Sequence, residues 1–198
     1  MEYFEKISKN YKLNNFNFIH SLIKQKESII FKKILKKYNN KKKIAALDVG
    51  SGAGFYSEIL YSKGIKNITC LDSSIGMLKQ IKIKKAKLVN KNIFQFRSKN
   101  KFDLIIVMGV IEFVSNYKNF LKQATRFAKK DTVIIILMPS KNLFSFFYYI
   151  FHLINGNLIH LYNANKIANY LNYLGWNILN HNKIFPQSTL IVAKLENE

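Results

Sequence analysis

The chain has 198 residues, of which 48% are hydrophobic, enough for one domain with a buried core but short for two. Its formal net charge of +21 comes from 32 lysine and arginine residues against 11 acidic ones, and only Arg97 and Arg126 are arginines. Compositional drift produces a lysine excess of this kind as readily as selection for an anion-binding surface, so charge alone does not indicate a nucleic-acid partner.

Neither a membrane span nor a metal site is expected. No uninterrupted apolar run reaches the roughly 18 to 20 residues of a membrane-spanning helix. Residues 1–12 alternate charged and aromatic side chains and lack the apolar region of a signal peptide. The single cysteine, Cys70, excludes a disulfide framework and has no partner at metal-ligand spacing. These features predict a protein without a bound metal that works in the reducing cytoplasm.

Hydrophobic periodicity predicts helices and strands that alternate along the chain. Helices are predicted over residues 14–38, 56–62, 74–84, 116–129 and 164–174. Strands are predicted over residues 44–49, 67–71, 87–89, 102–108, 132–138, 176–184 and 189–195. This order predicts a doubly wound α/β fold: a mostly parallel seven-stranded sheet with helices on both faces and a C-terminal antiparallel strand pair. In such folds the ligand lies beyond the carboxyl ends of the strands.

The turn after the first predicted strand reads Asp48-Val49-Gly50-Ser51-Gly52-Ala53-Gly54. Glycines allow positive φ angles and bring backbone N–H groups close to a ligand. A dinucleotide site would need the spacing G-x-G-x-x-G, whereas here the glycines alternate and an acidic residue precedes them. A carboxylate at this place would repel a pyrophosphate and suits a ligand that carries an ammonium group.

This turn resembles the first motif of the class I S-adenosylmethionine-dependent methyltransferases, an acidic residue followed by x-G-x-G-x-G. Asp72, at the end of the next strand, is similar to the acidic residue that binds both ribose hydroxyls in that family. Asn92 stands where the family usually has an aspartate that contacts the adenine amine. Met108 and Gly109 belong to a segment similar to the fourth-strand motif, which implies that they line the methionine end of the cofactor.

The resemblance runs from about Tyr3 to Leu195 and implies that the cofactor is S-adenosyl-L-methionine. The cofactor-binding residues that it implies are Tyr11, Asp48, Gly50, Ser51, Gly52, Gly54, Asp72, Ser73, Met77, Asn92, Ile93, Met108 and Gly109. Met77 fits a place in the core equally well.

Motifs that the sequence lacks narrow the range of molecules that could accept the methyl group. Enzymes that methylate exocyclic amines of bases share an Asn/Asp-Pro-Pro-Tyr/Phe tetrad after the fourth strand, where this chain has residues 108–111, Met-Gly-Val-Ile. Cytosine C5 enzymes need a nucleophilic cysteine, and Cys70 lies away from the acceptor side. The pattern looks most like the small-molecule branch, which includes quinone and tetrapyrrole methyltransferases. The opening Phe4-x-x-Ile7-x-x-x-Tyr11 is similar to the N-terminal lid of that branch.

Many members of this branch carry Glu-His-Val where this chain has Glu112-Phe113-Val114, so a commonly proposed general base is missing here. His160 and Tyr162 are the catalytic candidates to replace it, with structural packing as the other interpretation. Methyl transfer can also proceed by alignment and exclusion of water alone, without a dedicated base.

We expect a single methyltransferase domain over residues 1–198, with a helical lid over 1–40 and an aromatic insert over 141–162 on the acceptor side. The insert is interpreted either as a lid packed on the core, or as a pocket wall or membrane-touching surface for a lipid-like acceptor. Two further functions stay open, an RNA methyltransferase and a non-catalytic cofactor-binding protein. A small-molecule acceptor is the favoured partner, with nucleic acid or a peripheral membrane contact as alternatives.

Overall fold

The structure is a computed structural model that describes residues 4–5, 8, 18–38 and 43–196. Its helices from residue 18 onward are α3 (Phe18–Tyr38), α4 (Phe55–Ser62), α5 (Ile75–Leu78), the 3-10 turn η1 (Ile111–Phe113), α6 (Tyr117–Thr125), α7 (Leu143–Ile154) and α8 (Ala164–Tyr173). Its strands are β1 (Ala45–Val49), β2 (Asn67–Asp72), β3 (Lys87–Asn90), β4 (Phe102–Met108), β5 (Ala128–Pro139), β6 (Trp176–Ile184) and β7 (Ser188–Leu195).

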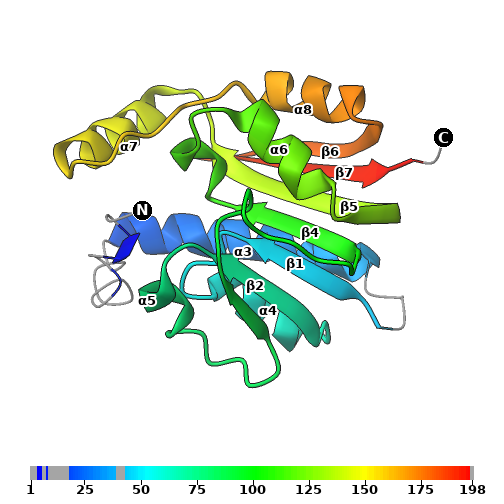
Figure 1. Ribbon diagram of the computed structural model, residues 1–198. Helices are drawn as coiled ribbons and strands as arrows, with labels where there is room; N and C mark the ends of the chain where they lie inside the picture. Colours follow the sequence, from blue (N-terminus) through cyan, green and yellow to red (C-terminus); the bar gives the residue numbers. More distant parts are fainter. Residues whose placement is uncertain (1–3, 6–7, 9–17, 39–42, 197–198) are drawn as a thin grey trace.

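The strands form one seven-stranded sheet in the order β3-β2-β1-β4-β5-β7-β6. Strands β1 to β5 pair in parallel, and β7 runs antiparallel between β5 and β6 (Figure 1). The predicted fold class is therefore confirmed. Because the order reverses at β1, the loops after β1 and β4 leave the same edge side by side, which is where a ligand is expected.

Two apolar layers cover the sheet, one on each face. Alternate residues of a strand point to opposite faces, so Leu47 belongs to the layer that includes residues of α6 and α8, and Ala46 to the layer that includes residues of α3 and α4. Figure 1 shows these helices on the two faces of the sheet. Phe31 of α3 and Leu121 of α6 are fully buried in the two layers. Helices on both faces leave the carboxyl edge as the open end of the domain.

Two predicted helices are longer than those observed. The helix predicted over residues 74–84 ends at Leu78, because Ile81 and Ile83 are both buried at a spacing of two that an extended chain provides. The helix predicted over 116–129 ends at Thr125, and β5 begins at Ala128, which pairs with Phe102.

The aromatic insert forms α7 and an extended segment that leads to α8. Helix α7 projects from the carboxyl edge of the sheet, on the same side as the start of α3 (Figure 1). No helix in the described part of the chain combines the length and apolarity needed to cross a membrane.

Candidate cofactor and acceptor site

The glycine turn is tied to the end of β2. The N–H groups of Gly50 and Ser51 both donate to the Leu71 carbonyl, at 2.7 and 3.1 Å. Gly50 has a φ of 69°, and a Cβ atom there would stand 2.9 Å from Val110 Cγ1 and closer still to Cγ2. Glycine is therefore required at this position, and the backbone of the turn lies against the segment that follows β4.

Asp72 joins the turns that follow β1 and β2. Its Oδ2 accepts from the Gly52 N–H and its Oδ1 from the Ser74 N–H, both at 2.8 Å. Burial raises the pKa of this carboxyl, the backbone N–H groups oppose that rise, and Glu5 adds to it. Each carboxylate oxygen keeps a further lone pair, so the group can also accept from two neighbouring hydroxyls of a ligand, as the ribose interpretation requires.

Asp48 is buried more deeply than is usual for a residue that contacts a ligand directly. Its side chain is 1% exposed, and its Oδ2 accepts from the Ser57 hydroxyl at 2.6 Å. Burial raises the pKa of Asp48 to about 7, with Asp72 adding to the rise and Ser57 opposing it. A cation bound nearby would favour the ionised carboxylate. The contact of Asp48 with a ligand stays a prediction.

Two buried side-chain oxygens, Ser51 Oγ and Glu112 Oε2, have no hydrogen-bond partner among the described residues. One lies in the glycine turn, and the other lies in η1, just after β4. An unsatisfied buried polar group costs about 1 to 3 kcal/mol. The Ser51 hydroxyl, in the glycine turn, fits a polar ligand bound there, so the residues present suit the expected cofactor.

The remaining cofactor predictions are distributed around this edge. Asn92 Oδ1 accepts from the Gln95 N–H at 2.9 Å, which leaves it one lone pair for a ligand. Ser73 and Gly109 are exposed, whereas Met77, Ile93 and Met108 are buried. Gly54 caps α4 with a φ of 87°. Tyr11 lies outside the described residues. Which of these residues touch a ligand stays a prediction.

The N-terminal residues that the structure describes cross the same edge. Glu5 Oε2 accepts from the Ser74 hydroxyl at 2.5 Å, and the Phe4 ring meets the Phe113 ring edge-on at 4.9 Å. These residues therefore connect the end of β2 with the loop after β4. Sequence reasoning placed a lid here but missed Glu5, whose only signal was its place in the alternating acidic and aromatic N-terminus.

The two catalytic candidates lie against the loop that carries Glu112. The His160 N–H donates to the Glu112 carbonyl at 2.7 Å, and its ring stacks on that of Tyr162 at 5.7 Å. The Tyr162 hydroxyl donates to the carbonyls of Val114 and Ser115, at 2.5 and 2.8 Å. Burial raises the pKa of Tyr162, so these contacts favour a role in positioning the loop over one in proton transfer. A catalytic role for either residue stays a prediction.

Sequence reasoning missed two further groups beside this loop. Glu112 was noted only for the histidine missing from the next position, yet it is 3% exposed and burial raises its pKa to about 8. His152, on the inner face of α7, has its ring 5.5 Å from that of Phe113. Within the described residues no group of three or more His, Cys, Asp or Glu could hold a metal ion.

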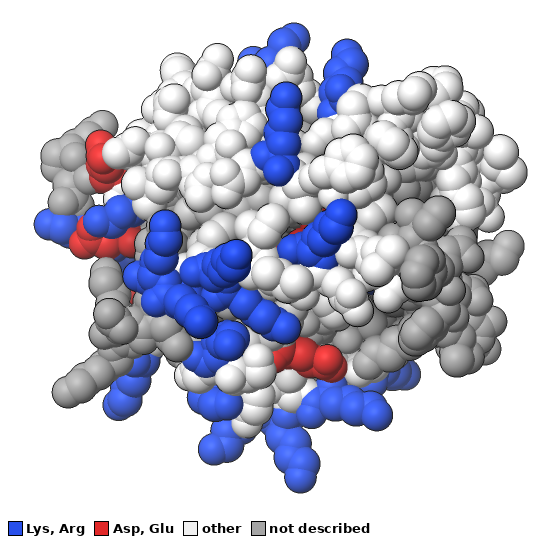
Figure 2. All heavy atoms as spheres, turned by 180° about the vertical axis from the view of Figure 1, so that it is seen from behind, with Lys and Arg blue, Asp and Glu red and all other residues white. Residues whose placement is uncertain are grey.

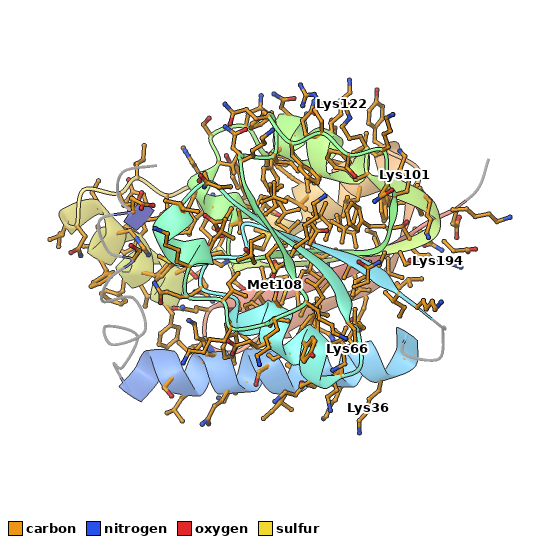
Figure 3. The ribbon with its side chains drawn as sticks, turned by 60° about the horizontal axis from the view of Figure 1, so that its bottom comes forward. Lys36, Lys66, Lys101, Met108, Lys122 and Lys194 are labelled. Atoms are coloured by element: carbon orange, nitrogen blue, oxygen red, sulfur yellow. The ribbon has the colours of Figure 1, made fainter. Side chains whose placement is uncertain are left out.

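The basic residues do not converge on this site. Figure 2 shows most Lys and Arg of one face over its middle and lower part, and Figure 3 shows labelled lysines on the outside of several elements around the interior Met108. The labelled lysines are Lys36, Lys66, Lys101, Lys122 and Lys194. Some are used locally, as in the ion pair of Lys194 with Asp131 at 2.6 Å. These positions give no support for an anion-binding role of the carboxyl edge.

Comparison with known proteins agrees with this geometry. Residues 47–136 match a methyltransferase domain. The chain is 34% identical over 130 residues to an uncharacterized protein of Methanocaldococcus jannaschii, a match covering 64% of this chain and 56% of that protein. It is 29% identical over 145 residues to a ubiquinone biosynthesis O-methyltransferase of Rickettsia canadensis, covering 69% and 61%. The chain thus spans less than two thirds of the length of these relatives.

Solved structures share the fold at low sequence identity. A magnesium protoporphyrin IX methyltransferase from Synechocystis with bound SAH has a TM-score of 0.78 at 16% identity, covering 98% of this chain and 96% of that one. A 1,6-didemethyltoxoflavin-N1-methyltransferase from Burkholderia thailandensis has a TM-score of 0.70 at 12% identity, covering 98% and 87%. Residues 47–136 thus match a methyltransferase domain, and the whole chain shares the fold of solved S-adenosylmethionine-dependent methyltransferases.

Proposed function

We propose that the chain is an S-adenosylmethionine-dependent methyltransferase that acts on a small apolar or lipid-like molecule. The observation that carries the proposal is the Asp72 carboxylate, held between the Gly52 and Ser74 N–H groups. It lies next to the turn that contains the Ser51 hydroxyl, which has no partner in the part of the chain that the structure describes. A ribose diol and the polar end of an amino acid are the groups that this arrangement suits.

Each group at the carboxyl edge then has a distinct task. When bound, the cofactor supplies a methyl group already activated on a sulfonium. Asp72 accepts from the ribose hydroxyls, the Ser51 hydroxyl orients the methionine end, and Gly109 leaves space beside the end of β4. Phe4 and Glu5 cross the edge and help to exclude water, which strengthens electrostatic interactions inside the site.

The relatives suggest the class of acceptor. Their names refer to ubiquinone biosynthesis and to magnesium protoporphyrin IX, a quinone lipid and a tetrapyrrole. Both are largely apolar molecules. We extend this class of apolar acceptor to the present chain. Its single cysteine, Cys70, is buried and free, in keeping with a reducing, cytoplasmic compartment.

Helix α7 supports a contact with a membrane surface because its polarity is inverted. Its buried residues are Ser145 and His152, whereas Phe147 and Ile154 are 63% and 79% exposed. The exposed apolar side chains of this helix are Leu143, Phe144, Phe146, Phe147, Phe151, Leu153 and Ile154. A helix that turns its apolar side outward needs an apolar partner, and a lipid acceptor would be dissolved in one.

The neighbourhood of α7 suits an anionic bilayer. Phe144 packs edge-on against Phe185 at 5.6 Å, and the Lys26 ammonium lies 5.6 Å from the Phe185 ring. Lys141 and Lys183, which are close in sequence to Phe144 and Phe185, are also exposed. Aromatic side chains at the interface with lysines around them attract anionic headgroups.

Isothermal calorimetry with S-adenosylhomocysteine tests the cofactor assignment, and we expect saturable binding with NAD inactive. Absence of binding at millimolar concentration would contradict the proposed function.

Sedimentation with vesicles of phosphatidylglycerol and phosphatidylcholine tests the membrane contact separately. Tight RNA binding that weakens steeply with salt, together with no vesicle binding, would favour the RNA methyltransferase instead.

A further inference from the structure

Two buried glutamates lie near the acceptor side, and they are held in opposite ways. Glu27 of α3 is 7% exposed and is satisfied: its Oε1 accepts from the Ser188 hydroxyl at 2.5 Å and its Oε2 from the Tyr56 hydroxyl at 2.9 Å. Glu112 of η1 is 3% exposed, and its Oε2 has no partner among the described residues. A carboxyl buried without a partner destabilises a fold, so its presence calls for another explanation.

Glu112 is placed beside the predicted point of methyl transfer. Its Oε1 lies 3.8 Å from where a Cβ atom on Gly109 would stand, and Gly109 directly follows β4. The His160 N–H holds the Glu112 carbonyl, and Phe4 and His152 pack on the ring of the next residue, Phe113. The loop is therefore held by three contacts, while one carboxyl oxygen of Glu112 has no partner among the residues that the structure describes.

The charged groups around Glu112 keep its carboxyl basic. Burial is the main cause of its raised pKa of about 8, and the charge of Glu27 adds to it. Lys24 of α3 interacts with Glu27, and burial lowers the pKa of Lys24, so this cation only partly offsets the acidic pair. In the described part of the chain, His152 of α7, His160 and Tyr162 are further titratable groups that meet this loop. A base with a pKa near the working pH is the most effective in proton transfer.

We propose that Glu112 is the general base of the reaction and that the acceptor is a phenol-like hydroxyl. The inference rests on the proposed function. The acceptor O–H bond breaks and its proton forms a bond with Glu112 Oε2. The acceptor oxygen forms a bond to the methyl carbon with the released electron pair, and the pair of the broken carbon–sulfur bond stays on sulfur. The carboxyl then returns its proton to water.

The same surroundings argue against an acidic acceptor. A carboxylate acceptor is already ionised at neutral pH, so its methylation needs no base. A phenol with a pKa of about 10 keeps its proton at neutral pH and needs a base to lose it during methylation. Oε2 has no partner among the described residues, and a hydroxyl acceptor, unlike a carboxylate, has a proton that this oxygen can take up.

The test compares Glu112→Gln with Glu27→Gln, two equivalent changes at buried glutamates. The probes are 4-dodecylcatechol and 4-dodecylbenzoate in mixed micelles, with formation of S-adenosylhomocysteine as the measure of turnover. For Glu112→Gln we expect kcat on the catechol to fall by about 100-fold or more, with an unchanged KM, since a positioned base contributes about 10² to 10⁴ in rate. Glu112→Asp, which retains a carboxylate, should recover part of the loss.

Two measurements independent of turnover separate a base from a structural residue. The melting temperature of Glu112→Gln should equal or exceed that of the natural chain, whereas Glu27→Gln should melt lower because it disturbs two hydrogen bonds. In ¹³C spectra of glutamate-labelled protein, one carboxyl signal that is missing from Glu112→Gln should titrate near pH 8. The pH profile of kcat should rise towards that pH in the natural chain and be flat in the variant.

Failure of the assignment of Glu112 can be distinguished from failure of the proposed function. If the chain does not bind S-adenosylhomocysteine, the proposed function itself is contradicted. If it binds the cofactor product but methylates only the benzoate, or neither probe, the hydroxyl assignment is overturned. Full activity of Glu112→Gln, or a Glu112 carboxyl that titrates at an ordinary pKa, overturns the assignment of the base.

Discussion

The structural role of Asp72 and the binding role that we propose for it can be separated by experiment. Its two oxygens accept backbone N–H groups from the turns after β1 and β2, so it orders the cofactor side even without a ligand. Asp103 offers a matched comparison on β4. Its carboxylate accepts from the Ala45 N–H at 2.9 Å and pairs with Lys129 at 2.8 Å, contacts that hold β4 to β1 and β5.

We expect Asp72→Ala to weaken the binding of S-adenosylhomocysteine by about 1.5 to 3 kcal/mol, the usual contribution of hydrogen bonds to a charged group. Asp103→Ala should leave that affinity within a few-fold and lower the melting temperature instead. Calorimetry measures the affinities and circular dichroism the folding. An unchanged affinity in Asp72→Ala, with binding abolished in Asp103→Ala, would mean that the second motif is misplaced.

Gly50 gives a prediction about the shape of the turn. Gly50→Ala combines a φ of 69° with an overlap on Val110, whereas a Cβ atom on Gly52 would meet nothing within 4 Å. We expect Gly50→Ala to lose cofactor binding and several degrees of melting temperature, and Gly52→Ala to lose less of both. Val110→Ala combined with Gly50→Ala should recover part of the loss. Equal effects of the two single changes would show that backbone strain alone decides.

At the scale of elements, α7 is the helix whose surroundings differ most from those of the others. It is anchored by Ser145 and His152, and Asn142 caps it by accepting from the Ser145 N–H at 3.0 Å. Because its exposed apolar residues contribute little to the described core, they can be replaced without unfolding the domain.

We expect Phe147→Ser combined with Ile154→Ser to abolish binding to anionic vesicles while leaving affinity for S-adenosylhomocysteine unchanged. Each side chain that enters an interface contributes about 1.5 to 3 kcal/mol of apolar burial. Tyr173→Ser on α8 is the matched control, because Tyr173 is 81% exposed but lies away from α7. Vesicle binding that survives the double change, or is lost equally in the control, would rule out α7 as the contact.

The strands and the cofactor turn were readable from sequence because they depend on local patterns. Runs such as Leu104–Met108 are apolar throughout, as buried parallel strands are, and the glycines stand at family spacing. The end of α5 and the burial of Glu112 were not readable. Both depend on neighbours that are distant in the chain. Ile81, just after α5, lies next to Gly54. The pKa of Glu112 in η1 is affected by the charge of Glu27 in α3.

On the scale of the whole molecule, buried acids make stability depend on pH. Glu112 and Asp48 have folded-state pKa values raised to about 8 and about 7, from ordinary values of 4.5 and 3.8. A raised pKa in the folded state means that the stability it contributes is fully present below the ordinary value and is lost as pH rises through the folded value.

We therefore expect the free energy of unfolding to fall as the pH rises from about 4 to about 8. Urea unfolding at a series of pH values measures the slope. Glu112→Gln should flatten the upper part of this curve, from about pH 5 to 8, and leave the part due to Asp48. A stability that instead increases across this range would show that Glu112 and Asp48 are ionised in the folded protein.

The position of α7 next to the Glu112 loop affects how the acceptor would be supplied. The His152 ring of this helix lies 5.5 Å from Phe113, so a bilayer held by its outer side would end close to the reacting carboxyl. Confining enzyme and acceptor to one surface raises their effective concentration, so weak intrinsic affinity for the acceptor suffices. Turnover would then follow the mole fraction of the acceptor in the bilayer, and diluting it with inert lipid would slow the reaction at constant total acceptor.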